Sequence, residues 1–293
     1  MSDSLESLSR KMGGARDLAS VVRTMKALAA SSIGQYEAAV RSLEDYYRSV
    51  ELGLVACVQN HQTVPIVDIK EKQAGPIGAL VFGSDQGLVG QFNDVLADFT
   101  VRALTAMPGE KQVWAVGERV RSRLADAGLP IAGFFPVPNS VAAITPLVGE
   151  IQVELEKSRA AGTSAGIYLF HNRPGSGATY HPASQRLLPL DEQWRRELTK
   201  LRWPTGNLPE VIGGDESTLR ALIREYLFVS LFRICAESLA SENSSRLVAM
   251  QRAEKNIDDL LVTLTRNYNR LRQTSIDEEL FDVISGFEAL TGS

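Results

Sequence analysis

A stretch without glycine or proline runs from Asp215 to Ser285 and reads DESTLRALIREYLFVSLFRICAESLASENSSRLVAMQRAEKNIDDLLVTLTRNYNRLRQTSIDEELFDVIS. Its apolar residues recur at intervals of three and four, which is the spacing of one face of an amphipathic helix. Asp215 is a candidate N-cap, and Glu216 places an acidic group in the first turn, where the helix dipole favours it. The stretch therefore predicts a helix on the order of 100 Å long.

Three polar residues, Arg233, Asn243 and Glu254, interrupt the apolar seam of this helix. After Leu271 the phase of the pattern slips and resumes at Ile276, which alters supercoiling locally without ending a helix. A helix of this length, with a seam spaced at 3.5 residues, needs a partner helix along most of its length. Because of the polar seam positions, we expect the helix to be only marginally stable by itself.

The first sixty residues supply such a partner. Apolar residues from Leu5 to Cys57 follow the same alternation, with a polar interruption at Lys26, and predict a helix of roughly 80 Å. Since the two helices lie at opposite ends of the chain, we expect residues 1–60 and 215–293 to form an antiparallel intramolecular coiled coil. Small seam residues favour a slender two-helix rod: Ala15, Ala19, Ala29, Ala236 and Ala240. The pattern alone is equally typical of two long helices in a bundle or a dimeric scaffold.

The pattern between residues 75 and 209 is mixed and predicts an inserted domain. We expect buried strands at residues 77–82, 113–116 and 167–170, with an edge strand at 183–190. Helices are predicted at residues 88–107, 118–127 and 141–160. Residues 131–137 form a short apolar stretch with Pro136 inside it and Pro138 just beyond. Alternating strands and helices predict a small doubly wound, Rossmann-like sheet, so the fold class is α/β.

The loop Gly83-Ser84-Asp85-Gln86-Gly87 after the first predicted strand is rich in glycine. It lacks the Lys-Ser or Lys-Thr pair of a Walker A loop, and Asp85 stands where a dinucleotide fingerprint has its first glycine. The glycines therefore favour a tight turn and close helix packing over phosphate binding. No nucleophile–base pair or pair of acids stands out, so we predict no catalytic residue, no cofactor site and no metal site.

Composition sets further limits. The chain has 293 residues, a formal charge of -4 and a pI near 5.6, which argues against a dedicated nucleic-acid binder. Cys57 and Cys235 make no disulfide framework, and three scattered histidines (His61, His171, His181) do not suggest a metal centre. The first residues lack the pattern of a signal peptide, and no apolar run is long enough to cross a bilayer. We therefore expect any membrane association to come through partners.

Several motifs, in order along the chain, resemble the gamma chain family of rotary ATP synthases. Ser238-Leu239-Ala240-Ser241-Glu242, with Arg246 and Ala249-Met250, is similar to the family's S-L-A-S-E-x-x-x-R-x-x-A-M stretch. The other matching segments are Tyr268-Asn269-Arg270, Arg272-Gln273, Ser275-Ile276 with Glu279, the loop Gly83 to Asn93, and Thr24-Met25-Lys26 with Ala29-Ala30-Ser31. The resemblance spans the whole chain and is strongest over its last 60 or so residues.

The chain also departs from the family pattern. Residues 32–37 read SIGQYE where the family usually has a basic run, and Val89 replaces the usual loop cysteine. Asp277 stands where the family commonly has threonine. The chain therefore resembles a divergent branch of the family.

The resemblance implies that the two terminal helices are the axle of a rotor inside a hexamer of three alpha and three beta chains. The foot of the rotor would dock on the epsilon chain and the membrane c-ring, at the cytoplasmic face of a bacterial plasma membrane. Neighbouring chains would bind and make ATP, so this chain needs no cofactor, no nucleic acid and no membrane insertion of its own. By the same resemblance, Arg272 and Gln273 contact a beta-chain loop, Arg246 and Glu279 support this coupling, and Met25 faces the catalytic chains.

Two other functions remain open on the residues alone. The first is a non-rotary coiled-coil scaffold that carries an α/β module. The second is an enzyme whose α/β domain binds a nucleotide and whose helices form an arm. Copurification separates them: a rotor comes with alpha and beta chains, a scaffold dimerises alone, and an enzyme retains nucleotide by itself.

Overall fold

The computed structural model describes residues 4–60, 75–160, 166–177, 179–207, 209–211 and 215–291. Helix α1 (Leu5–Asn60) and helix α6 (Asp215–Thr291) flank the α/β segment in the sequence. The chain divides into two compact units. Unit 1 comprises Met1–Ala29 and Leu247–Ser293, and unit 2 comprises Ala30–Arg246.

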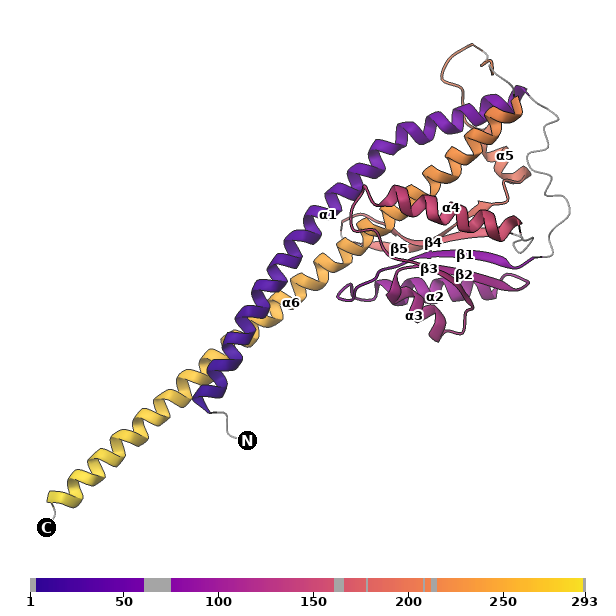
Figure 1. Cartoon of the computed structure of the whole chain (residues 1–293). Coiled ribbons are helices and arrows are strands. Elements are labelled where there is room, and N and C mark those ends of the chain that lie inside the picture. Colours follow the sequence, from indigo (N-terminus) through magenta and orange to yellow (C-terminus); the bar gives the residue numbers. More distant parts are fainter. Residues whose placement is uncertain are drawn as a thin grey trace. The chain divides into compact units, whose positions relative to one another are not determined.

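In unit 1 the two helices pack with opposite chain directions, as the periodicity predicts (Figure 1). Leu8 and Met12 of α1 form one buried cluster with Leu264 of α6. Nearer the middle of the chain, α1 and α6 bury a second cluster made of Ala15, Ala19, Val22, Met250 and Ile257. The low numbers of α1 thus meet the high numbers of α6, which confirms an antiparallel coiled coil.

In unit 2 the same two helices continue the antiparallel pairing. The rings of Tyr47 and Tyr226 lie 5.8 Å apart, and Leu54 and Leu219 share one buried cluster. Trp194, on the short helix α5 (Glu192–Thr199), packs edge-on against Tyr226. The helix pair is therefore joined to the α/β part of unit 2 by aromatic and aliphatic contacts.

The sheet of unit 2 has five strands in the order β3-β2-β1-β4-β5. The strands are β1 (Ile77–Phe82), β2 (Lys111–Val116), β3 (Ile131–Phe135), β4 (Gly166–Pro174) and β5 (Tyr180–Leu188). The first four are parallel, and β5 is antiparallel to β4 at the edge. This is the doubly wound arrangement predicted for the inserted domain, with β5 as the predicted edge strand.

Helices cover both faces of the sheet in unit 2 (Figure 1). On one face, α2 (Phe92–Thr105) and α3 (Glu118–Asp126) bury a cluster around Val81, Ala115 and Phe170. On the other face, α4 (Ile144–Ala160) and the middle of α6 bury a larger cluster around Leu80, Phe82, Trp114 and Leu169. The long helix is thus itself a covering layer of the sheet.

Two elements were not predicted from the sequence. Residues 131–135 form the strand β3, which pairs with β2 at the edge of the sheet and fully buries only Phe135. Pro136 follows it directly, so the sequence showed an apolar stretch interrupted by proline and did not mark a strand. Helix α5 is short, and its local signal is the N-cap Asp191, whose side chain accepts a hydrogen bond from the Trp194 backbone N at 3.0 Å.

Candidate functional site

The middle of α6 carries a run of buried polar residues, several of which bond to the α/β part of unit 2. Its members are Glu237, Ser238, Ser241, Glu242, Asn243, Ser244 and Ser245. Ser238 Oγ donates a hydrogen bond to the Phe82 carbonyl at the end of β1, at 2.9 Å. Ser245 Oγ donates another to the Val89 carbonyl in the loop that follows. The S-L-A-S-E motif therefore attaches the long helix to the carboxyl end of β1.

Glu237 is the centre of a buried charge network. Its carboxylate accepts a hydrogen bond from His171 Nε2 at 2.9 Å and from Arg233 Nε at 2.8 Å, and Arg173 Nε lies at 3.5 Å. Burial by itself would raise the pKa of Glu237, but the hydrogen bonds from His171 and Arg233 outweigh it and lower that pKa to about 2. Burial lowers the pKa of His171, so the ring is neutral and its Nε2 carries the proton. The pair joins α6 to β4 and explains why Arg233 occurs at a seam position.

The glycine-rich loop after β1 is fixed by its own side chains. The Ser84 backbone N donates a hydrogen bond to Asn93 Oδ1 at 3.0 Å, and Asn93 Nδ2 donates one to Ser84 Oγ at 2.8 Å. Gly83 lies so close to α3 that an added Cβ would stand 2.3 Å from the Cβ of Val120. Gly90 has φ +56, a left-handed conformation that glycine adopts without strain. The structural interpretation of these glycines, a tight turn with close helix packing, agrees with this geometry.

Asp85 explains why this loop is poorly suited to a phosphate. The first backbone amides of a helix attract anions, which is how α/β domains commonly bind phosphate groups. Here the Asp85 carboxylate takes that place: it accepts from Glu118 N at the start of α3 at 2.9 Å and from Val137 N after β3 at 2.8 Å. The chain's own carboxylate thus joins the loops that follow β1, β2 and β3.

Arg246, one of the residues predicted to take part in coupling, lies at the end of the polar run. Its guanidinium pairs with the Glu242 carboxylate and donates to Asn243 Oδ1 at 3.2 Å. Only 14% of its side chain is exposed. Arg246 is therefore held by its own helix, one turn away from residues that contact the sheet.

Met25, the second predicted residue, lies in unit 1 and is partly buried against the cluster of Ala19, Val22 and Met250. Beside it, the polar interruptions of the two seams meet: Lys26 of α1 forms an ion pair with Glu254 of α6. Arg23 contacts the same carboxylate at 3.3 Å. The sequence marked Lys26 and Glu254 as separate defects of two seams, whereas the structure brings them together as one ionic contact.

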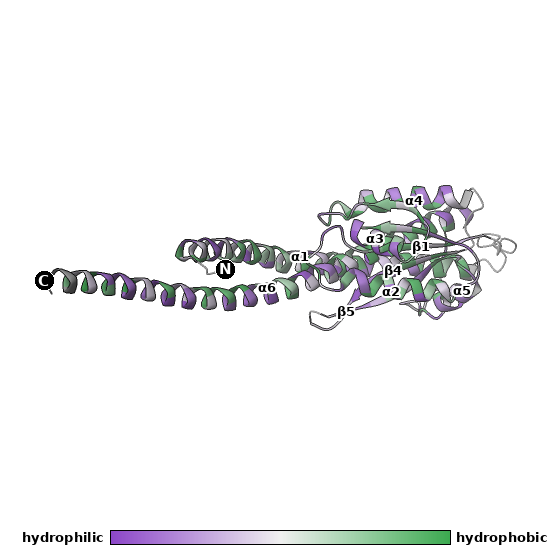
Figure 2. Cartoon of the chain, turned by 90° about the horizontal axis from the view of Figure 1, so that it is seen from below, coloured by the Kyte–Doolittle hydropathy of each residue, from purple (hydrophilic) through white to green (hydrophobic). Residues whose placement is uncertain are grey.

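Arg272, Gln273 and Glu279 lie exposed on the C-terminal part of α6 in unit 1. Beyond Leu271, α6 continues past the point where α1 begins (Figures 1 and 2). The apolar side chains of this extension, called here the tip of α6, are largely exposed: Ile276, Leu280, Phe281, Val283, Ile284 and Phe287. An exposed apolar surface of this kind marks an interaction site.

The tip of α6 has two different sides. Ile276, Leu280, Val283 and Phe287 recur at intervals of four and three, so they form one stripe along the helix. Glu278, Glu279 and Asp282 occupy the side of the helix away from this stripe, whereas Asp277 lies between Ile284 and Phe281. The tip is therefore apolar on one side and acidic on another.

The five predicted residues do not form one cluster. Arg246 belongs to unit 2, and the other four belong to unit 1. Of those four, Arg272, Gln273 and Glu279 lie in the tip of α6, whereas Met25 lies on α1. The residues that sequence reasoning missed are Asp85, His171 and Glu237, because each acts through a partner far away in the sequence. Only the position of Asp85 after a strand end gave a signal for it.

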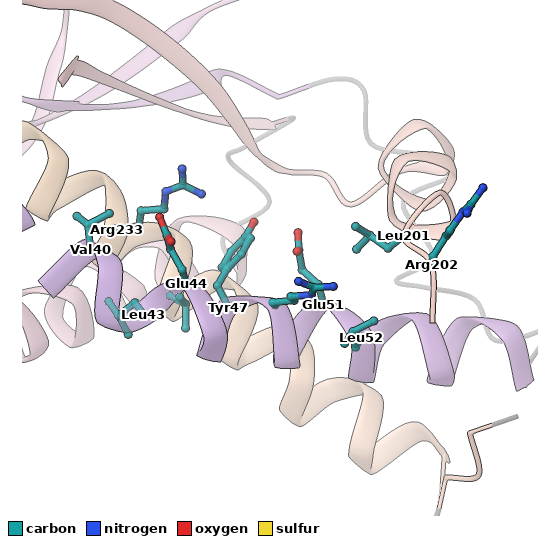
Figure 3. A pocket seen from close by; sticks show the side chains of 11 residues that line it. Val40, Leu43, Glu44, Tyr47, Glu51, Leu52, Leu201, Arg202 and Arg233 are labelled. Carbon is teal, nitrogen blue, oxygen red and sulfur yellow. The ribbon is translucent and has the colours of Figure 1, made fainter. Parts of the chain in front are cut away.

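A cavity of about 450 Å³ lies in unit 2 between α1, α6 and the residues that follow α5 (Figure 3). Its walls are mostly apolar, and Glu44, Tyr47 and Glu51 extend from the same side of α1. Burial raises the pKa of both Tyr47 and Glu51. Arg48, Arg202 and Arg233 also line the cavity, so charges of both signs surround it, and its chemistry favours no single class of ligand.

Across the described ranges, the histidine, cysteine and acidic side chains do not gather in threes or more as a dedicated metal centre would require. His61 lies outside the described residues, and His181 lies on β5. Within the same ranges, none of the helices combines the length and the apolar character needed to span a bilayer.

Comparisons with known proteins agree with this architecture. Residues 4–290 match a family model described as ATP synthase. The chain is 29% identical to the ATP synthase gamma chain of Syntrophus aciditrophicus, with 98% of each chain covered. It is 25% identical to the ATP synthase gamma chain of Desulfitobacterium hafniense, covering 98% of this chain and 99% of that one.

Solved structures show the same fold at lower sequence identity. One is a chain of the Euglena gracilis mitochondrial ATP synthase, OSCP/F1/c-ring, in rotational state 3, with TM-score 0.67, 17% identity, and coverage of 98% of this chain and 95% of that one. Another is a chain of the Tetrahymena thermophila mitochondrial ATP synthase central stalk/c-ring, with TM-score 0.55, 20% identity, and coverage of 80% and 99%. With a family match over nearly its whole length, the chain belongs to the ATP synthase gamma-chain family.

Proposed function

We propose that this chain is the central-stalk rotor of a rotary ATP synthase, coupling proton or sodium-ion flow through a membrane ring to ATP synthesis or hydrolysis. The observation that carries the proposal is the tip of α6. Among the described residues no helix pairs with this end of α6, and large apolar side chains are exposed on it, in a chain whose family is that of gamma chains. Exposing apolar side chains to water is unfavourable, so such a surface marks a site that a partner covers.

The partners proposed are three alpha chains, three beta chains, an epsilon chain and the membrane c-ring. Support comes from the similar solved chains, whose assemblies are titled with F1, rotor, central stalk and c-ring. The proposed location is peripheral, at the cytoplasmic face of a bacterial plasma membrane. The rotor would be attached there through the c-ring rather than through a helix of its own.

The two-sided tip gives the rotor a physical means of coupling. A ring of similar subunits around the tip would meet an apolar side in one direction and an acidic side in another. Each subunit then experiences a different interaction free energy, and the conformation favoured in each changes as the tip turns. This is coupling by differential contact: the rotor changes nucleotide affinity at a distant site by favouring one conformation of each subunit.

Within this scheme we assign roles to the predicted residues. Arg272 and Gln273 are exposed at the start of the tip and would contact a beta-chain loop in some rotary states. Arg272 brings a permanent planar charge to this contact, and Gln273 brings an amide that both donates and accepts hydrogen bonds. Glu279 belongs to the acidic side of the tip and would support the same contact. Met25 would face the catalytic chains, and Arg246, fixed by Glu242, would support coupling from its position on α6.

The test is the double variant Arg272→Ala with Gln273→Ala, coexpressed with the alpha, beta and epsilon chains of the same organism. The complex should still copurify with three alpha and three beta chains, because exposed helix residues contribute little to folding. ATP hydrolysis and ATP-driven ion pumping should both fall several-fold. A matched control, Thr265→Ala with Arg266→Ala, removes one charge and one polar group from an exposed stretch of the same helix and should retain normal rates.

One outcome would contradict the rotor function, and another only the roles given to two residues. If the wild-type chain purifies alone as a dimer, the chain is a scaffold and not a rotor. If the assembled double variant keeps wild-type rates, the contact assigned to Arg272 and Gln273 is wrong, while the rotor function stands on copurification and pumping.

A further inference from the structure

A second, smaller cavity of unit 2 has chemistry that the rotor function does not use. It measures about 200 Å³ and lies between the loop after β1, the loop after β3, α1 and α6. The side chains of Asp85, Glu242, Asn243, Tyr36 and Arg246 line it. Unlike the cavity of Figure 3, it carries oxygen-bearing side chains from four separate parts of the chain, Asn139 of the loop after β3 among them.

Glu242 is the unusual member of this group. The residue is 5% exposed, and one of its carboxylate oxygens, Oε1, pairs with Arg246. The other oxygen, Oε2, is buried and has no hydrogen-bond partner in the described part of the chain. A buried carboxylate oxygen without a donor is costly, so this atom calls for a positive or donating ligand.

Asp85 supplies a second, fixed carboxylate. Its two oxygens each accept one backbone N–H, from Glu118 and from Val137, and a carboxylate has further lone pairs to offer. Arg246 offsets one of the two negative charges, and its guanidinium is already engaged by Glu242 and Asn243. One negative charge therefore remains uncompensated within the cavity.

We propose that this cavity binds one hydrated divalent cation of the Mg²⁺ class, held by Glu242 Oε2 and the Asp85 carboxylate. Magnesium in proteins usually keeps several of its waters and is held through only one or two carboxylates. A cavity of about 200 Å³ has room for an ion with several waters, at roughly 30 Å³ for each water. Tyr36 and Asn243 add neutral oxygens that can bind those waters.

The consequence is a metal link between the α/β part of unit 2 and its helix pair. Asp85 belongs to the loop after β1, and Glu242 belongs to α6. A cation shared by the two carboxylates stabilises the folded state of unit 2 in proportion to how tightly it binds. This inference is independent of the rotor function, since it concerns the isolated chain.

The experiment titrates the purified full-length chain with Mn²⁺ and follows the free-ion signal by electron paramagnetic resonance. We expect one Mn²⁺ per chain, displaced by excess Mg²⁺. Glu242→Gln keeps the size of the side chain and a partner for Arg246 but removes the charge, and it should weaken Mn²⁺ binding at least tenfold. Asp85→Asn should weaken binding by a similar factor. Glu154→Gln, at a partly exposed carboxylate on α4, is the matched control and should leave binding unchanged.

A second measurement guards against misfolding of the variants. Millimolar Mg²⁺ should raise the melting temperature of the wild-type chain and of Glu154→Gln but not that of Glu242→Gln, with circular dichroism confirming that all are folded. Absence of a Mn²⁺ site in the wild-type chain, or equal affinity in folded Glu242→Gln, would overturn the proposal and leave the cavity to water.

Discussion

Single polar side chains attach α6 to the sheet of unit 2. Glu237 meets His171 of β4, and Ser238 meets the last carbonyl of β1. Each partner lies on a strand far away in the sequence, so the spacing along α6 marks these residues as polar but does not identify what they contact. The sequence marked Arg233 as a polar break in the seam, whereas in the fold its guanidinium donates a hydrogen bond to Glu237.

The Glu237 network predicts acid sensitivity of a defined sign. The pKa of Glu237 is lowered from its ordinary 4.5 to about 2. Its contribution to the free energy of unfolding is therefore fully present above pH 4.5 and is lost as the pH falls toward 2. The pKa of His171 is also lowered, so protonation of the unfolded state below about pH 6.5 acts in the same direction. Glu237→Gln should destabilise unit 2 by about 1–3 kcal/mol at pH 7, because the buried His171 and the half-exposed Arg233 lose a charged acceptor. The free energy of unfolding of the variant should also decrease less than that of the wild type between pH 4.5 and pH 2.

Urea unfolding of the full chain at several pH values measures this effect. The control is Glu216→Gln, which removes a carboxylate from an exposed ion pair on the same helix and should change stability little at any pH. If Glu237→Gln and Glu216→Gln show the same pH profile, His171 and Arg233 do not keep Glu237 ionised as described.

At the scale of elements, small residues set how closely α1 and α6 approach. Ala19 is 3% exposed and packs in the cluster with Val22, Met250 and Ile257. Ala19→Leu adds volume where the two helices meet and should cost about 1–3 kcal/mol of stability through overpacking. Ala27→Leu makes the same change at an exposed site of α1 and should change the free energy of unfolding by no more than about 0.5 kcal/mol. Thermal unfolding followed by circular dichroism compares the two, and equal melting temperatures would argue against a tight helix pair.

The two long helices could be predicted because their apolar periodicity extends over many turns, and the parallel strands β1, β2 and β4 because each is a short, continuous apolar run. Strand β3 was missed because it has only one neighbour and two exposed side chains.

The site was less predictable than the fold. Periodicity marked Arg233 and Glu254 as out of place, but pairs such as Lys26 with Glu254 depend on the register between the helices, which no local pattern encodes.

At the scale of the whole molecule, we expect a partner chain to cover the exposed apolar side chains of the tip of α6. In the isolated chain, amides from residue 276 onward should exchange with solvent quickly, since no helix packs beside them to oppose local opening. In the assembled complex the exchange of the same amides should be at least tenfold slower. Exchange of β1, at the centre of the sheet, is the internal control and should be slow in both states. Unchanged exchange of the tip on assembly would mean that its apolar side is not the covered surface.

Rotation itself tests the central claim most directly. Cys57 and Cys235 are buried, so Ala125→Cys on the exposed side of α3 adds a thiol that can be labelled selectively. With the alpha and beta chains immobilised, a probe on that thiol should turn in one direction when ATP is added and stop when ATP is removed. A probe that stays fixed in a complex that hydrolyses ATP would contradict the rotor function.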